Sequence, residues 1–309
     1  MRILVVTSGR ADACPLQPVI AELQTWAKVA NGMIASGSLS GCMKEVDAHL
    51  EVDPPDLMLL LGDRYETLIA ATAATYHRIP IAHIHGGEAS FGSFDNQMRD
   101  AITKLAHIHF VANEAAWERL IALGERDNIW GTGAPGLDNL VDLPPRERKD
   151  YIVATYHPPT LGDLGEFDAL LGALDSMNVE VIWTSPNADP GHGAIRHALW
   201  GRDVRDLPHD EFLRLSKNAA CIVGNSSMGI IEAPFMRVPS VNYGVRQEGR
   251  LTGPSVFNCK DNIVGTIRAA MDYEGPFVCL YEGPGASKEI SDILQTIDLD
   301  GILVKRWSS

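Results

Sequence analysis

The chain alternates short apolar runs with amphipathic helical segments along most of its length. The apolar runs lack the period of two that marks a half-exposed strand, so we expect strands covered on both faces, as in a parallel sheet. Successive parallel strands need crossover connections, which the helices between them supply. The expected strands cover residues 2–7, 57–61, 79–85, 108–112, 151–156, 179–184, 220–224 and 240–243.

Helical patterns fall between these runs. The expected helices cover residues 16–28, 66–76, 95–105, 115–123, 166–176, 193–200, 209–217 and 227–235. Residues 36–48 are ambiguous, because the small residues of a loop are followed there by half of a helical pattern. The alternation as a whole predicts an α/β protein built from doubly wound, Rossmann-like domains.

Two such domains are expected, because 309 residues exceed the usual size of one. The pattern breaks at residues 142–150, where prolines and charged residues make a suitable linker. We therefore predict a first domain of residues 1–145 and a second of 146–309, whose last helix packs back on the first. In doubly wound folds ligands bind at the carboxyl ends of the strands, so an interdomain cleft is the expected site.

Charge and cysteine content exclude several classes of protein. The net charge of −14 argues against a nucleic-acid-binding protein. No apolar run approaches the roughly 20 residues that span a bilayer, so no membrane partner is expected. The first residues have the pattern of a strand rather than of a signal peptide. The five cysteines include no CxxC pair, which predicts free thiols in a cytoplasmic protein.

The segment Gly224–Glu232 (GNSSMGIIE) has the features of a phosphate-binding turn. A small-residue turn and two hydroxyls, on Ser226 and Ser227, stand between an apolar run and a helix, where amide groups and the helix dipole favour an anion. Glu232 is placed to accept both hydroxyls of a ribose; its apolar neighbours make a plain surface charge less favoured. Arg246, in the following GVRQEGR segment, adds a cation.

Two further residues of the second domain follow strands. His157, in Tyr-His-Pro, ends the first strand of that domain, where an imidazole can bond a phosphate, a hydroxyl or a developing charge. Asn187 follows the next strand and can bond a ribose or a base. The alternative for Asn187 is ordinary turn chemistry, since Asn-Ala-Asp-Pro-Gly forms turns without any ligand.

In the first domain, two motifs follow strands. Arg10, in Ser-Gly-Arg-Ala-Asp, is placed to reach a diphosphate; the alternative is a solvated arginine beside a helix cap made by Asp12. Asp63 and Arg64, in Gly-Asp-Arg-Tyr-Glu, come directly after an apolar strand. Asp63 is a candidate catalytic carboxylate, a candidate helix cap, or both.

The segment Ala82–Glu88 (AHIHGGE) is the third of these strand ends. Strand alternation puts His83 and His85 on one face. Glu88 and Asp95 are expected to join Asp63 in supplying carboxylates for acid–base chemistry, with their mutual crowding raising one or more pKa values.

A second His-x-His pair, His107 and His109, raises the question of a metal. No carboxylate or cysteine stands at a typical ligand spacing, so we expect no metal, and structural roles for His107 and His109.

Taken together, the motifs GDRYE, HIHGGE, DNQMRDAITK, GNSSMGIIE and GVRQEGR resemble those of the hydrolysing UDP-N-acetylglucosamine 2-epimerases. These enzymes make N-acetylmannosamine for sialic acid synthesis, and close relatives act on the diacetamido-trideoxy sugar nucleotide of legionaminic acid synthesis. The resemblance implies a GT-B-like fold of two Rossmann-like domains, a UDP-sugar substrate, a homodimer or homotetramer, no cofactor and no metal.

By motif, the resemblance assigns a role to each candidate residue. It implies acid–base roles for Asp63, Glu88 and Asp95, an active-site imidazole at His157, and substrate contacts from Arg10, Arg64, His85, Ser226, Ser227, Glu232 and Arg246; Asn187 is added from its place in the chain. The implied reaction removes the proton at C2, eliminates UDP from C1 to give a 2-acetamidoglucal, and then hydrates C1 while C2 is reprotonated on its other face.

The sequence departs from the family pattern in three places. Animal relatives have glutamate at the position of His85, so the resemblance implies that Glu88 takes over the role of that glutamate here. Cys14 stands where some members have serine. The stretch between the first motif and GDRYE is short, which predicts the loss of a strand–helix unit from the first domain. A non-hydrolysing UDP-sugar 2-epimerase and a binding module without catalysis therefore stay as alternatives.

Overall fold

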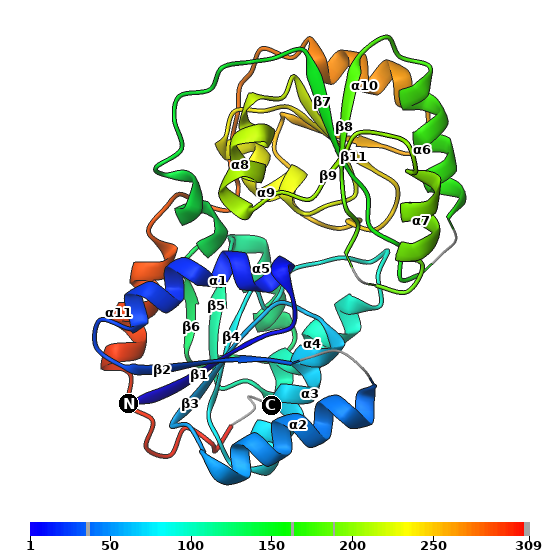
Figure 1. Ribbon diagram of the computed structural model, residues 1–309. Coiled ribbons are helices and arrows are strands. Elements are labelled where there is room, and N and C mark those ends of the chain that lie inside the picture. The colour runs from blue at the N-terminus through cyan, green and yellow to red at the C-terminus, as the bar shows by residue number, and fades with distance from the viewer. Residues whose placement is uncertain (35–37, 162–163, 188, 306–309) are drawn as a thin grey trace. The chain divides into compact units, whose positions relative to one another are not determined.

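The computed structural model describes the chain except for residues 35–37, 162–163, 188 and 306–309, and except for the side chains of Arg10 and Ala11. The chain forms two compact units, and each is built on one six-stranded sheet (Figure 1). Unit 1 comprises residues 1–88, 95–138 and 281–309, and unit 2 comprises residues 89–94 and 139–280.

The sheet of unit 1 is parallel throughout, with the strand order β2-β1-β3-β4-β5-β6. Its strands are β1 (Arg2–Thr7), β2 (Lys28–Met33), β3 (Leu57–Leu61), β4 (Ile81–Ile84), β5 (Ile108–Val111) and β6 (Ile129–Gly131). Its helices are α1 (Arg10–Leu23), α2 (Leu39–Val52), α3 (Tyr65–Tyr76), α4 (Asp95–Leu105), α5 (Glu114–Ala122), the short 3-10 helix η1 (Pro135–Leu140), which continues into unit 2, and α11 (Ala286–Thr296).

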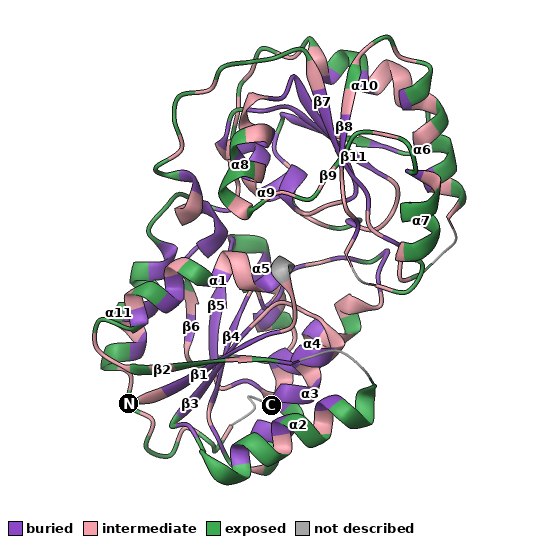
Figure 2. Cartoon of the chain, viewed as in Figure 1, coloured by how far each residue is buried: buried purple, intermediate pink, exposed green. Residues whose placement is uncertain are grey.

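Helices cover both faces of this sheet, as the unalternating apolar runs predict. In β1, Leu4 and Val6 belong to the core beneath α2 and α3, while Ile3 and Val5 belong to the core beneath α1 and α11. Figure 2 shows the central strands buried and the outer sides of the helices exposed.

Helix α11 packs against α1, far from it in sequence (Figure 1). The indole N–H of Trp26 donates to the Ser291 hydroxyl at 2.8 Å, which ties the two segments together. The last helix therefore belongs to unit 1.

The sheet of unit 2 is also parallel throughout, in the order β12-β11-β10-β7-β8-β9. Its strands are β7 (Tyr151–Thr155), β8 (Glu180–Thr184), β9 (Val204–Arg205), β10 (Cys221–Gly224), β11 (Ser240–Tyr243) and β12 (Val256–Cys259). Its helices are α6 (Gly165–Asp175), α7 (His192–Ala198), α8 (His209–Asn218), α9 (Met228–Phe235) and α10 (Ile263–Met271).

The strand orders locate where each unit is built to bind a ligand. A doubly wound sheet opens a crevice at its switch point, where the chain reverses direction across the sheet. In unit 1 that point lies between β1 and β3, and in unit 2 between β7 and β10. The predicted motifs around Arg10 and Asp63 follow the first pair of strands, and those around His157 and Ser226 follow the second.

The eight expected strands all form, but four more were not predicted: β2, β6, β9 and β12. The first is largely exposed at the edge of its sheet, and the other three have four residues or fewer. The ambiguous stretch 36–48 contributes to α2 from Leu39 onward. The stretch between β1 and β3, where the sequence predicts the loss of a strand–helix unit, contains α1, β2 and α2. Strands and helices therefore still alternate there.

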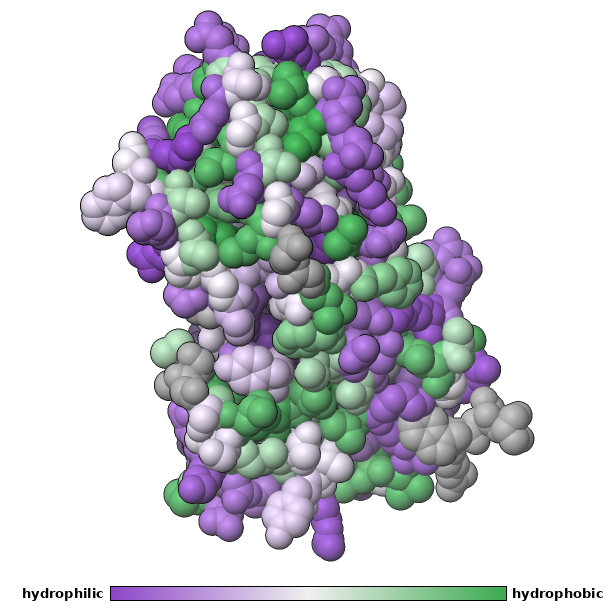
Figure 3. Space-filling model, turned by 90° about the vertical axis from the view of Figure 1, so that its right-hand side faces the viewer, coloured by the Kyte–Doolittle hydropathy of each residue, from purple (hydrophilic) through white to green (hydrophobic). Residues whose placement is uncertain are grey.

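All five cysteines are free thiols, as the sequence predicts. Cys42, Cys221 and Cys259 are buried free thiols, while Cys14 and Cys279 are half-buried. Within the described ranges, no helix combines the length and hydrophobicity needed to cross a bilayer. Figure 3 shows hydrophilic and apolar side chains interspersed over the face drawn there.

Candidate functional site

The carboxylates of unit 1 are organised by a buried arginine of α4. Asp63 follows β3 through Gly62, which has the left-handed φ of 82° and lets the chain turn at the strand end. The Asp63 carboxylate forms an ion pair with Arg99, which is only 1% exposed. Arg99 also donates to the carbonyl oxygen of Glu88 at 2.6 Å. One guanidinium therefore joins the GDRYE and HIHGGE segments.

Glu88 is itself buried and held at both carboxylate oxygens. Its Oε1 accepts from the side-chain amide of Asn113 at 2.7 Å, and its Oε2 accepts from the Tyr281 hydroxyl at 3.5 Å. Asp95 is the first residue of α4, at the positive end of the helix dipole. The i, i+4 spacing puts Asp95 on the same face of the helix as Arg99.

The strand alternation predicted for His83 and His85 does not extend to His85. The strand ends at Ile84, and His85 has φ 64°, outside the extended region in which side chains alternate. His83 lies in the interior, with Nε2 2.8 Å from the Gly62 carbonyl oxygen and Nδ1 3.3 Å from the Thr103 hydroxyl. Burial lowers the pKa of His83 to about 3, so it is neutral and structural.

The second histidine pair also bonds inside unit 1. Nδ1 of His107 accepts from the Ile81 amide at 3.1 Å, and His109 lies 3.4 Å from Glu125. Burial lowers the pKa of His107 to about 4. Among the residues that the structure describes, no group of three or more His, Cys, Asp or Glu is arranged to hold a metal ion.

The two arginines predicted to contact the substrate from unit 1, Arg10 and Arg64, lie at the starts of helices. Arg64 lies directly before α3 and bonds the buried Glu66 through Nε at 3.1 Å and Nη2 at 3.3 Å. The Arg10 side chain lies outside the described residues; its backbone begins α1. Asp12 accepts from the amides of Ser8 and Gly9, as expected of a residue that caps this helix.

In unit 2, Asn225 holds the strand ends together at the switch point. It is 1% exposed and follows β10. Its Oδ1 accepts from the His157 amide at 2.7 Å, and its Nδ2 donates to the His157 carbonyl oxygen at 2.8 Å. Its own carbonyl oxygen accepts from Arg246 at 3.1 Å and from the Gln247 side chain at 3.0 Å.

The imidazole of His157 has a defined tautomer. The amide of Asn187 donates to its Nδ1 at 3.2 Å, so in the neutral ring the proton is on Nε2. His157 and Asn187, predicted from separate strand ends, are thus brought together. The Asn187 side chain bonds Asp189, while its Oδ1 is buried without a hydrogen-bond partner in the described part of the chain.

The turn after β10, for which the sequence predicts phosphate binding, requires a glycine. Gly224 has φ 141°, and a Cβ at that position would lie 1.8 Å from the Thr155 carbonyl oxygen of the neighbouring strand. Ser226 accepts from the Met228 amide at 3.4 Å, and the Ser227 side chain makes no capping bond to α9. The amides of Gly229 and Ile230 bond the carbonyl oxygens of Ser226 and Ser227, as in the first turn of a helix.

Glu232 lies on α9 and is half-buried. Its Oε2 is buried and has no hydrogen-bond partner among the described residues. Burial raises the pKa of this carboxyl to about 7, against the opposing charge of Arg250. A buried acceptor without a donor is the arrangement expected where a ligand's hydroxyl groups complete the bonding.

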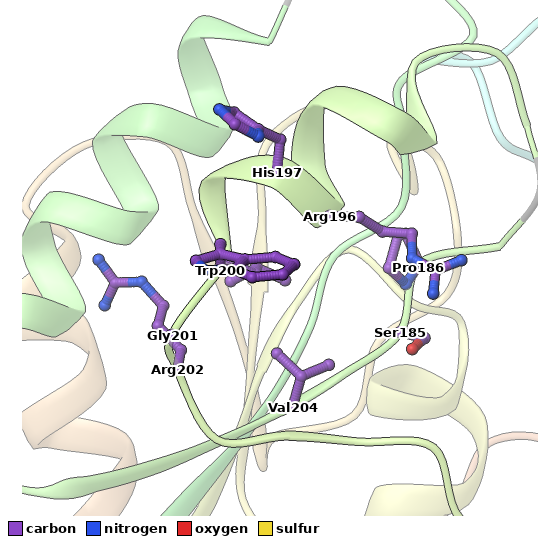
Figure 4. Close-up of a pocket in the computed structure, with 9 residues that line it drawn as sticks. Ser185, Pro186, Arg196, His197, Trp200, Gly201, Arg202 and Val204 are labelled. Carbon is purple, nitrogen blue, oxygen red and sulfur yellow. The ribbon is translucent and has the colours of Figure 1, made fainter.

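A pocket of about 370 Å³ lies beside α7 in unit 2, apart from the predicted residues (Figure 4). Trp200 lies along it, 88% exposed, with Arg196 beside Pro186 and Ser185. Pro186 directly precedes Asn187, but Asn187 itself does not line the pocket.

The family model of UDP-N-acetylglucosamine 2-epimerases matches residues 23–295 of the chain. This chain belongs to the UDP-N-acetylglucosamine 2-epimerase family. It is 34% identical over 287 residues to the UDP-N,N'-diacetylbacillosamine 2-epimerase (hydrolyzing) of Legionella pneumophila, covering 84% of this chain and 76% of that protein. It is 33% identical over 234 residues to the GDP/UDP-N,N'-diacetylbacillosamine 2-epimerase (hydrolyzing) of Campylobacter jejuni, covering 67% of this chain and 61% of that one.

The fold matches solved members of the 2-epimerase family. The crystal structure of Methanocaldococcus jannaschii UDP-GlcNAc 2-epimerase in complex with UDP-GlcNAc and UDP aligns with a TM-score of 0.80, covering 96% of this chain and 99% of that one. At 16% identity this likeness shows the fold alone. The predicted α/β fold of two doubly wound, GT-B-like domains is confirmed.

Sequence reasoning missed three residues of the candidate site: Arg99, Asn225 and Gln247. Each stands inside a motif already singled out, and none is predicted from strand ends alone. The spacing of Asp95 and Arg99 was a usable signal, because an i, i+4 pair of opposite charge at a helix start shares one face. Asn225 and Gln247 gave no comparable signal, since they act on backbone groups.

Proposed function

We propose that this chain is a hydrolysing 2-epimerase, which converts a UDP-linked 2-acetamido sugar to the free 2-epimer and UDP. The observation that carries the proposal is the 34% identity, over 84% of the chain, to a hydrolysing epimerase of Legionella pneumophila. The candidate residues for such a reaction are divided between the two units.

The acid–base half of the reaction is assigned to unit 1. Removal of the C2 proton needs a carboxylate base, and its return to the other face of C2 needs an acid. Asp63, Glu88 and Asp95 are the proposed groups. Arg99 keeps Asp63 and the Glu88 backbone at a fixed separation, which favours a defined geometry at the reacting carbon.

The leaving-group half is assigned to unit 2. Elimination places negative charge on the departing UDP, and hydroxyl, imidazole N–H and guanidinium groups stabilise such charge. Ser226, Ser227 and Arg246 are the proposed diphosphate contacts, with the Nε2–H of His157 as a further donor. Glu232 is proposed to accept the ribose hydroxyls, Asn187 to bond the nucleoside, and Arg10, Arg64 and His85 to contact the substrate from unit 1.

The substrate to test first is UDP-N,N'-diacetylbacillosamine, because two similar relatives carry that substrate in their names. UDP-N-acetylglucosamine, the substrate of the sialic acid route, is the second candidate. Both carry an acetamido group at C2, so the same proton abstraction and elimination apply to either.

The deciding experiment is a proton NMR time course in D₂O with each sugar nucleotide. We expect release of UDP and deuterium at C2 of the free sugar, in equal amounts. A UDP-linked epimer without free UDP would instead identify a non-hydrolysing epimerase. Stabilisation of the protein by UDP without any turnover would identify a binding module, since ligands that bind only the folded state raise its stability. UDP release without deuterium would exclude elimination.

Single substitutions test the assignment of roles. Asp95→Asn and Asp63→Asn should each lower kcat by roughly 100-fold or more, the usual contribution of an acid–base group. Asp127→Asn, at an exposed position of unit 1, is the matched control and should leave kcat unchanged. UDP affinity, measured by calorimetry, should be retained in all three, because the proposed nucleotide contacts are elsewhere.

We also propose that the protein acts in the cytoplasm as a homodimer or homotetramer, as the family resemblance implies. Sedimentation velocity at micromolar concentration measures the assembly directly. A monomer that turns over the substrate would exclude any need for a partner subunit in catalysis.

A further inference from the structure

The segment Ala89–Phe94 separates two of the proposed catalytic carboxylates in sequence, yet it belongs to the other unit. Glu88 and Asp95 are counted in unit 1, whereas residues 89–94 make their contacts in unit 2. The chain therefore leaves unit 1 directly after Glu88 and returns directly before Asp95. Whatever fixes this short segment also constrains, through two peptide bonds, the backbone that carries both carboxylates.

One end of the segment is packed on the loop that carries Arg246. The amide of Phe91 donates to the carbonyl oxygen of Glu248 at 2.8 Å. Gly92 lies so close to the same loop that a Cβ would stand 1.9 Å from the Val245 carbonyl oxygen. Only glycine permits this approach, so the contact is a specific one.

The other end is held by Thr160, on the loop that follows His157. Its Oγ1 accepts from the amide of Phe94 at 3.1 Å and lies 2.6 Å from the Ser93 hydroxyl. Ser93 is buried and Thr160 half-buried. The Phe94 amide stands immediately before the first residue of α4, so Thr160 satisfies a backbone donor at the point where that helix, with Asp95, begins.

We infer that Thr160 is a positioning residue for the proposed reaction: through Ser93 and Phe94 it fixes the start of α4 and hence the place of Asp95. The inference rests on the proposed function. Thr160 itself does not touch the reacting atoms; it acts by holding residues 89–94 on the unit that carries His157 and Arg246. The same segment continues directly into the backbone of Glu88 at one end and of Asp95 at the other.

Thr160→Val tests the inference, because it removes the hydroxyl and keeps the shape of the side chain. We expect kcat to fall about tenfold or more, since small misplacements of catalytic groups are costly. UDP affinity should stay within about twofold, because Ser226, Ser227 and Arg246 are intact. Thr160→Ser keeps the hydroxyl and should recover most of kcat. Thr266→Val, which removes an exposed hydroxyl on α10, is the control and should resemble the wild type.

Gly92→Ala probes the other end of the segment, since its methyl group meets the Val245 carbonyl. It should lower kcat as well, and combined with Thr160→Val its effect should be less than additive, because both release the same segment. Equal kcat in the wild type and Thr160→Val would overturn the inference. So would a loss of UDP affinity in Thr160→Val as large as the loss of kcat, which indicates general disruption.

Hydrogen exchange separates this inference from the proposed function. In the wild type, amides of residues 91–98 should exchange more slowly than in Thr160→Val. This readout needs no turnover. A wild-type protein inactive on every sugar nucleotide would refute the proposed function, while the exchange pattern would still decide whether Thr160 holds the segment. Identical exchange in both proteins would refute that role.

Discussion

The side-chain amide of Asn225 forms two hydrogen bonds with the backbone of His157, one at its N–H and one at its C=O. These residues follow β10 and β7, the strands on either side of the switch point in unit 2. With these two bonds the Asn225 side chain continues the hydrogen bonding between β10 and β7 past the ends of the strands. The crevice where a doubly wound sheet binds its ligand therefore has a fixed width at this position.

Asn225→Ala should destabilise the protein by about 2–3 kcal/mol, because it leaves two backbone groups of His157 unsatisfied. Urea unfolding followed by circular dichroism measures this. kcat should fall together with stability, since His157 loses its support. Asn218→Ala is a control that removes a single, exposed bond to the Glu147 amide and should cost less than about 1 kcal/mol. Equal costs for the two variants would refute the role given to Asn225.

Gly224→Ala should abolish folding or cost more than about 4 kcal/mol, the range reached by severe steric and backbone strain. The added methyl group would lie 1.8 Å from a backbone oxygen of β7, which cannot move without breaking the sheet. Gly172→Ala is the matched control: nothing lies within 4 Å of its Cβ, and it stands inside α6. It should raise stability by about 0.5–1 kcal/mol. Soluble yield and thermal unfolding report both effects.

Strands and helices with strong periodic signals were predictable, and edge elements were not. Leu57–Leu61 was expected with the bounds observed, because five apolar residues in a row fit only a buried element. Lys28–Met33 was missed because it lies at the sheet edge and alternates little between apolar and polar residues. Its pairing with β1 comes from backbone hydrogen bonds, which leave no trace in side-chain hydropathy.

Candidate residues that directly follow a strand could be predicted from the sequence. Residues whose role is to hydrogen-bond a distant backbone group could not. His157 and Ser226 lie at the switch point, as the motif positions indicate. Arg99 lies in the second turn of α4, and its bond to the Glu88 carbonyl depends on the three-dimensional course of the chain. The alternation expected for His83 and His85 was wrong because the strand ends at Ile84 and His85 itself has a positive φ.

Lys305→Met should destabilise unit 1 by about 2–4 kcal/mol. The ammonium of Lys305 bonds the carbonyl oxygens of Lys104 at 3.1 Å and Thr103 at 3.4 Å, near the C-terminus of α4, and pairs with the buried Glu125 at 2.8 Å. Removing it leaves a buried carboxylate with less compensation and the C-terminal end of α4 with one cation fewer. Lys288→Met, which breaks an exposed i, i+4 pair with Asp292, is the control and should leave the unfolding temperature close to that of the wild type, because solvent screens an exposed ion pair. Thermal unfolding distinguishes the two.

Glu232 should give the protein a pH dependence that Glu232→Gln lacks. Burial raises the pKa of the folded carboxyl from 4.5 to about 7, so between these values the folded state keeps a proton that the unfolded state has lost. Stability contributed by this proton is complete below pH 4.5 and is lost as the pH rises through 7, by up to about 3 kcal/mol. Urea unfolding at several pH values should show wild-type stability falling relative to Glu232→Gln over this window.

The same titration should appear in nucleotide binding with the opposite sign. A ribose diol donates to an ionised carboxylate, so bound UDP favours the charged form of Glu232, and UDP affinity should increase as the pH rises through 7. The phosphates of UDP also titrate, and their effect on the pH dependence of UDP affinity is measured with Glu232→Gln. The difference between the profiles of the wild type and Glu232→Gln is then the effect of the Glu232 carboxyl group. Parallel affinity profiles in calorimetry would show that Glu232 does not meet the ribose. A diverging profile with an inflection near pH 7 would place its carboxylate against the diol.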